Sequence, residues 1–101
     1  MLALTLIRRA DILEALGRFE EALTGARAAL SVAERHDDED LQIAAALWEQ
    51  LHLTTHGKAT SEALARVLDR ATAARITPRP LTRRLVAAAA RLLGRSSPTG
   101  S

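Results

Sequence analysis

The sequence has no cysteine and no tyrosine, and only one tryptophan and one phenylalanine among its 101 residues. Disulfide scaffolds, thiolate zinc sites and cysteine nucleophiles are therefore excluded, and since nothing indicates an oxidising compartment, we expect the cytoplasm. The β-branched and aromatic residues with which sheets pack are scarce, whereas 21 alanines and 17 leucines favour helix. The composition predicts an all-α protein, and the length predicts one domain.

Long apolar runs are also missing. Residues 1–7 are apolar apart from Thr5, but Arg8 and Arg9 end this run, and a signal peptide has its basic residues first. A membrane span requires roughly 18 consecutive apolar residues, which this sequence does not contain. We therefore expect a soluble chain that does not enter a membrane.

Acidic residues are absent from the last third of the chain. Residues 1–69 carry seven basic residues and all 12 acidic ones, whereas residues 70–101 carry seven arginines and no acid. The net charge of +2 at pH 7 thus hides a basic C-terminal segment that follows an acidic one.

Apolar residues recur at intervals of three and four, which is the spacing of one face of a helix. In the first segment, the expected buried stripe consists of Leu2, Leu6, Ala10, Leu13 and Leu16. The same spacing continues in four later segments, so the sequence predicts five helices. Their approximate ranges are 2–16, 18–33, 41–56, 61–71 and 81–93.

Four breaks separate these segments. They lie at Gly17, His36 to Asp40, Gly57 and Thr77 to Pro80. Glycine suits the end of a helix, proline disfavours helix in the residue before it, and Asp38 or Asp40 is expected to cap the third helix. Short connections favour antiparallel neighbours. We therefore expect one domain over residues 1–94, made of two antiparallel helical hairpins and a C-terminal amphipathic helix, with a disordered tail at 95–101.

The first hairpin resembles a tetratricopeptide repeat. Small residues stand at the three positions where helices of that family pack most closely, namely Ala10, Ala22 and Ala29, and Gly17 and Phe19 occupy the positions of its turn glycine and following aromatic residue. The spacing of about 41 residues between Glu-Ala-Leu segments is similar to the longer repeats of bacterial signalling ATPases and transcription regulators.

This resemblance implies a right-handed α-solenoid whose concave face binds a peptide or helix of another protein. It implies a non-catalytic interaction module, such as a scaffold or adaptor within a regulatory protein. No nucleophile with its base, glycine-rich phosphate loop or pair of buried carboxylates is evident, so we expect neither enzyme activity nor a cofactor.

Two clusters of polar residues were considered as metal sites. Glu49, His52 and His56 are spaced by three and four, but we interpret them as a solvent-facing surface because no second set of ligands is evident. The acidic run from His36 to Asp40 lacks the glycine turn of a calcium loop, and helix capping explains it better. We therefore expect no metal.

The basic C-terminal helix has several interpretations. The favoured one is a solvated face that complements the acidic first part of the chain. Docking of a partner protein would use Arg79, Arg83, Arg84 and Arg91. Nucleic-acid binding by a regulator is the alternative function, although no aromatic residues are present to stack bases. A membrane surface is disfavoured because tryptophan and phenylalanine anchors are missing there.

The first helix predicts an association surface. Four large apolar residues near its start point in several directions around the helix: Leu2, Leu4, Leu6 and Ile7. One buried stripe cannot include all of them. In the repeat interpretation this helix stands at an uncovered end of the stack. We expect a homodimer through residues 2–16 or docking of this end onto a larger chain.

Overall fold

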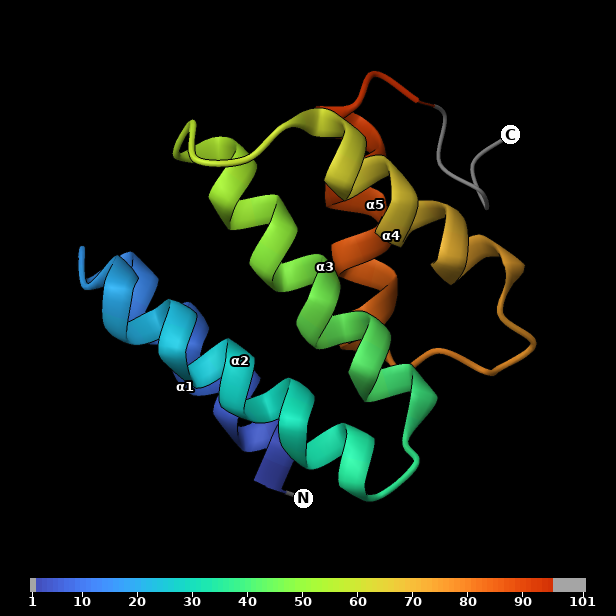
Figure 1. Cartoon of the computed structure of the whole chain (residues 1–101), viewed down its shortest axis with the longest axis horizontal. Coiled ribbons are helices and arrows are strands. Elements are labelled where there is room, and N and C mark those ends of the chain that lie inside the picture. Colours follow the sequence, from blue (N-terminus) through green and yellow to red (C-terminus); the bar gives the residue numbers. More distant parts are fainter. Residues whose placement is uncertain (1, 96–101) are drawn as a thin grey trace.

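The computed structural model describes residues 2–95, and in this part of the chain all regular secondary structure is α-helical (Figure 1). The five helices are α1 (Leu2–Ala15), α2 (Phe19–Arg35), α3 (Glu39–Thr55), α4 (Ser61–Ala73) and α5 (Pro80–Leu92). The predicted all-α class with five helices is confirmed, and the predicted breaks lie where these helices end. None of the described helices is long and apolar enough to cross a membrane.

Residues with positive φ follow four of the five helices: Gly17 after α1, Asp37 after α2, Gly57 after α3 and Gly94 after α5. Gly17 has a φ of +78° and Gly57 one of +71°, a conformation that costs glycine little because it has no Cβ. The amide of Arg18 then donates to the carbonyl of Leu13 over 2.8 Å, which closes the end of α1. Asp37 adopts the same left-handed conformation after α2, with a φ of +51°, although it is not a glycine.

The start of α3 is capped by a side chain. Asp38 Oδ1 accepts a hydrogen bond from the backbone amide of Leu41 over 3.1 Å, so of the two predicted caps Asp38 is the one used. Thr60 stands at the cap position of α4 without a side-chain hydrogen bond. Pro80 is the first residue of α5, where its missing amide hydrogen costs nothing.

Helix α3 lies in the middle of the molecule, with α1 and α2 on one side and α4 and α5 on the other (Figure 1). It packs against all four other helices, whereas no Cα atom of α1 or α2 lies within 8 Å of a Cα atom of α4 or α5. Its buried residues accordingly cover more than half of its circumference, an arc of about 200° at 100° per residue. They are Asp40, Leu41, Ile43, Ala44, Ala45, Leu47 and Trp48.

The prediction of the buried face of α1 is wrong, because the observed buried face is rotated about the helix axis from the predicted one. The buried residues are Ala3, Ile7, Ala10 and Leu13, whereas Leu2 and Leu16, both expected inside, are 61% and 66% exposed. At 100° per residue, the observed face is turned by roughly 65° from the expected one. Apolar residues occupy most of the circumference near the start of α1, so periodicity alone does not select a side. Packing against α2 and α3 selects it.

Candidate interaction surfaces

The alanines that carry the repeat resemblance lie in the core. Ala10, Ala22 and Ala29 are fully buried, as expected for small residues where helices meet. A Cβ atom added to Gly25 would lie 4.0 Å from that of Ala10 and 3.8 Å from the carbonyl oxygen of Leu6, so α1 and α2 approach closely here. Gly25 belongs to the same close contact, which the sequence analysis did not recognise.

Phe19 joins the start of α2 to the end of α3. Its ring stacks on that of His56 with a centroid distance of 4.0 Å and an angle of 22° between planes. Lys58 Nζ lies 5.8 Å from the centroid of the phenylalanine ring and 3.6 Å from Glu20 Oε1. The aromatic residue after the turn glycine therefore fills the space between the first hairpin and the helix that follows it.

Trp48 and His52 face α1 from α3. The indole Nε1–H of the fully buried Trp48 donates to Asp11 Oδ1 over 2.6 Å, and the His52 ring lies 4.1 Å from the indole, tilted by 33°. Burial lowers the pKa of His52 below its ordinary value; the carboxylates of Glu14 and Asp11 raise it to a smaller extent, and His56 lowers it further. Nothing in the sequence indicated Asp11 as the partner of Trp48, because the two residues are 37 positions apart.

The structure separates the three residues considered as a metal set. Glu49 Oε2 accepts from Arg27 Nε over 2.8 Å, whereas Glu14 Oε1 lies 4.0 Å from His52 Nδ1 and 3.8 Å from His56 Nε2. Glu49 and His52 are partly buried between helices, so their interpretation as a solvent-facing surface is wrong. Within residues 2–95, no histidine and carboxylate group is arranged to hold a metal ion.

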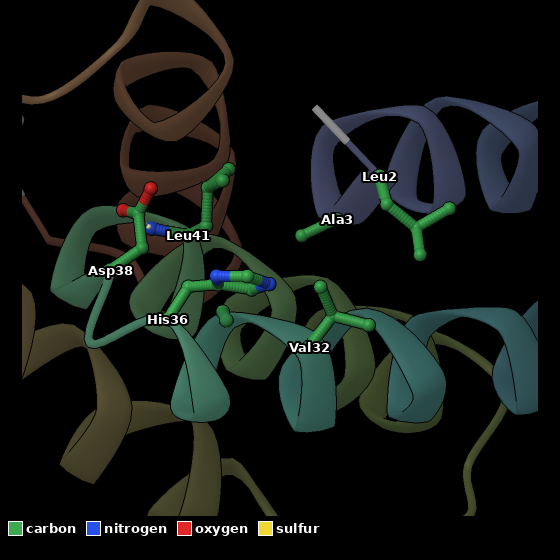
Figure 2. Close-up of a pocket in the computed structure, with 7 residues that line it drawn as sticks. Leu2, Ala3, Val32, His36, Asp38 and Leu41 are labelled. Carbon is green, nitrogen blue, oxygen red and sulfur yellow. Dashed lines mark hydrogen bonds between the residues drawn. The ribbon is translucent and has the colours of Figure 1, made fainter.

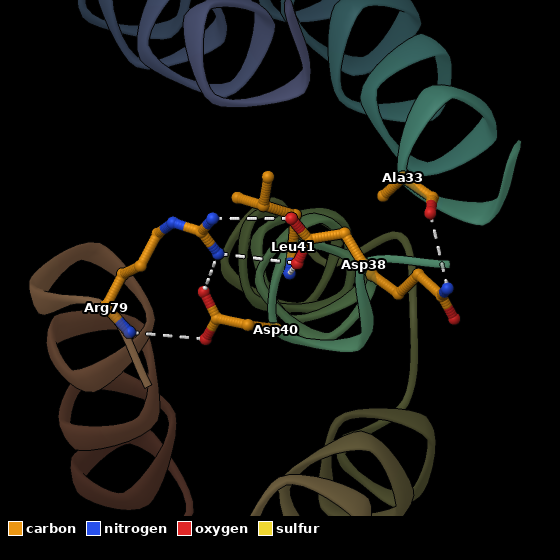
Figure 3. A network of polar contacts seen from close by, with 6 residues as sticks. Ala33, Asp38, Asp40, Leu41 and Arg79 are labelled. Carbon is orange, nitrogen blue, oxygen red and sulfur yellow. Dashed lines mark hydrogen bonds and ion pairs between the residues drawn. The ribbon is translucent and has the colours of Figure 1, made fainter. Parts of the chain in front are cut away.

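Arg79 connects the segment before α5 to the start of α3 (Figure 3). Its guanidinium donates to Asp40 Oδ2 over 2.6 Å and to both carboxylate oxygens of Asp38 over 3.3 Å, and its backbone amide donates to Asp40 Oδ1 over 3.3 Å. The hydrogen bond to Asp40 is the main reason that the pKa of Arg79 is raised above its ordinary value. Two of the four carboxylates of the acidic run are thus paired with an arginine of the basic segment.

The other C-terminal arginines differ in their surroundings. Arg83 is exposed, and its Nη1 lies 3.4 Å from the carbonyl oxygen of Pro78. Arg95, assigned by sequence to a disordered tail, donates its amide to Ala90 and its guanidinium to Asp69 over 2.9 Å. The rest of that predicted tail, residues 96–101, lies outside the described residues.

A shallow groove of about 370 Å³ runs between α1 and α5, and we call it the α1–α5 groove. Its lining consists of Asp11, Leu81, Arg84, Leu85, Ala87, Ala88 and Arg91. Arg84 and Arg91 are seven residues apart, so they stand two turns apart on one side of α5. Leucine and alanine make the groove apolar between these two cations. Of the four arginines expected to contact a partner, Arg84 and Arg91 therefore share one surface.

A second hollow of about 330 Å³ opens at the other end of α1, where α2 ends and α3 begins (Figure 2). Its walls are apolar, with Leu2, Ala3, Val32, Ala33 and Leu41. His36 and Asp38 provide its polar side chains, and Asp38 is already engaged by Arg79 and by the cap of α3. The hollow therefore provides an apolar surface, and one of its two polar side chains is already engaged in other interactions.

The residues predicted as a dimer surface on α1 have different environments. Ile7 is fully buried in the core, so it contributes nothing to an outer surface; Leu4 and Leu6 pack partly against the core, and Leu2 is exposed. Ile12, which was not among the residues predicted for this surface, is 61% exposed. Ile12 and Leu16 lie on the side of α1 that faces away from the other helices.

Comparisons with known proteins bring no further identification. No protein-family description, no curated protein and no solved structure matches this chain.

Proposed function

We propose that the chain is a non-catalytic protein-interaction module, part of a regulatory protein, that holds a peptide or helix of another protein in the α1–α5 groove. The observation that supports this most directly is the pairing of an apolar groove floor, Leu81 and Leu85, with two arginines at its rim, Arg84 and Arg91. Guanidinium groups bind carboxylates with two parallel hydrogen bonds, and apolar surface contributes affinity without directional demands.

The preferred partner segment follows from this lining. An amphipathic helix would place its apolar side against Leu81, Leu85 and Ala88. Acidic residues spaced by about seven along that helix would face Arg84 and Arg91, because seven residues correspond to about two turns. The resemblance to tetratricopeptide repeats supports the same choice, since α1, α3 and α5 would then correspond to the helices that line the concave face.

A crosslinking experiment tests this proposal. A photoreactive phenylalanine analogue at Ala88 should crosslink a protein partner under native conditions, and the double variant Arg84→Glu, Arg91→Glu should lose that product by about tenfold or more. Arg83→Glu is the matched control, because Arg83 has the same charge and helix but does not line the groove. Recovery of no partner, or equal capture by the double variant and the control, would contradict the proposal.

Binding of nucleic acid is the alternative, and it is less well supported. Arg79 and Arg95 of the basic segment already pair with Asp38, Asp40 and Asp69, which removes two cations from a continuous phosphate-binding surface. Anisotropy of a labelled DNA duplex separates the two functions. Binding at low salt that weakens steeply with added salt, and again with Arg83→Glu, would favour nucleic acid.

A further inference from the structure

Large apolar side chains are exposed mainly on one helix face. Among residues 2–95, four such side chains are clearly exposed, and three of them, Leu2, Ile12 and Leu16, lie on α1. Together with Thr5 and Arg9 they follow spacings of three and four along the helix. These five positions therefore form one stripe, whose centre lies about 125° around the helix from that of the buried residues, with the spacing of a helix–helix contact. We call it the outer stripe.

A shallow hollow of about 320 Å³ lies beside the outer stripe, between α1 and α2. Leu6, Arg9, Ala10, Leu13, Glu21, Thr24, Gly25 and Ala28 line it. Glycine and alanine on the α2 wall leave room for another helix to approach closely. Arg9 and Glu21 provide opposite charges on the two walls. The surface is thus apolar, grooved and bordered by one cation and one anion.

We propose that this surface pairs with the same surface of a second copy of the chain, through a two-fold axis near Arg9. The outer stripe has leucine at both ends, Leu2 and Leu16, each seven residues from Arg9. In an antiparallel pairing, Leu2 of one copy therefore faces Leu16 of the other. This single antiparallel pairing buries both ends of the outer stripe.

Charge complementarity supports a second copy as the occupant. The exposed charges of α1 are Arg8 and Arg9, whereas α2 begins with Glu20 and Glu21. The two-fold axis brings the two Arg9 side chains close together, and their repulsion is relieved when each pairs with Glu21 of the other copy, which also accepts from its own Arg18 over 2.8 Å. Each copy thereby supplies both the cation and the anion that the other requires.

The area available implies a weak dimer. Fourteen residues make α1 only about 21 Å long, so the contact is short and belongs with the small, weak class of specific interfaces. We therefore expect dissociation in the micromolar range and exchange between monomer and dimer. This proposal is independent of the partner bound in the α1–α5 groove, which lies on another side of α1.

Sedimentation equilibrium over a wide concentration range measures this association. The wild-type chain should pass from monomer to dimer as its concentration rises, and Leu16→Glu or Ile12→Glu should weaken the dimer by about 100-fold or more, because each carboxylate would be buried at the interface. Leu92→Glu is the matched control, since Leu92 is 47% exposed on α5, far from the outer stripe in sequence. Unchanged far-UV circular dichroism confirms that each variant folds.

A charge exchange tests the proposed geometry. Arg9→Glu and Glu21→Arg should each weaken the dimer by about fivefold to tenfold, and the double variant should recover most of that loss, because the ion pair is restored with reversed sign. A monomer at every concentration would overturn the proposal and leave the outer stripe to a different protein. A dimer that Leu16→Glu leaves intact, or that Leu92→Glu weakens equally, would also overturn it.

Discussion

Trp48 and Asp11 form a buried polar link between α1 and α3. The indole nitrogen is fully enclosed and donates to the aspartate carboxylate over 2.6 Å, across a sequence separation of 37 residues. A buried indole requires an acceptor, and Asp11 supplies a charged one at the wall of the α1–α5 groove. The same carboxylate therefore contributes to stability and to the groove.

Asp11→Ala should destabilise the chain by about 1–3 kcal/mol, because the buried indole N–H loses its acceptor. Urea unfolding monitored by circular dichroism measures the free energy of unfolding. Asp69→Ala is the control: its carboxylate is 68% exposed and pairs only with a surface arginine, so we expect a loss below about 1 kcal/mol. Equal losses for the two variants would contradict the assigned role of Asp11.

Arg79→Met should cost about 2–4 kcal/mol of unfolding free energy, since Asp40, only 8% exposed, would be left without its cation. The value is below that of a fully buried pair because the Arg79 side chain is 33% exposed. Arg83→Met removes a neighbouring charge without such a partner and should change stability by less than about 0.5 kcal/mol. Chemical denaturation of both variants in the same buffer makes the comparison, and a stable Arg79→Met chain would show that the network contributes little.

Ala22→Leu should cost about 1–3 kcal/mol, because Ala22 has no exposed surface and three further carbons require the surrounding helices to move apart. Ala73→Leu, at the exposed end of α4, is the control and should leave the melting temperature nearly unchanged. Calorimetry of the two variants measures the difference. An unchanged melting temperature for Ala22→Leu would show that the contact between α1 and α2 is loose.

Stability should fall when the pH drops below about 6.5, the ordinary pKa of histidine. Burial lowers the pKa of His52 in the folded chain, so between that lowered value and 6.5 the unfolded chain binds the proton more readily. The contribution of neutral His52 is complete above this range and is lost as the pH falls through it. His52→Gln should therefore show a smaller decrease in melting temperature between pH 7.5 and 5.5 than the wild-type chain. His36→Gln, at an exposed site, should retain the full decrease.

Local signals in the sequence were sufficient for the helices and their ends. Gly17 and Gly57 terminate helices because the backbone there adopts positive φ, and Asp38 caps α3 through its own carboxylate. The burial of Ala10 and Ala22 also agreed with the repeat resemblance. These features depend on residues close together in the chain, where spacing and residue type carry the information.

Tertiary pairings were not accessible in this way. Arg79 was expected to face a partner, but its guanidinium reaches Asp40, 39 residues earlier, and no periodicity encodes that distance. The orientation of α1 was missed for a related reason: leucines surround the start of the helix, and only contact with α2 and α3 determines that Ile7 is buried. The α1–α5 groove likewise places Asp11, near the start of the chain, beside residues of α5, near its end.

The central position of α3 makes the two helix pairs on either side of it depend on each other for stability. Because α1 and α2 approach α4 and α5 only through α3, each pair covers one side of α3, whose buried residues span more than half of its circumference. Removing either pair would expose Leu47, Trp48 or their neighbours to water, so neither half is a separate folding module. Unfolding should be a single cooperative event, and a strain applied to one pair is transmitted to the other by rotation or bending of α3.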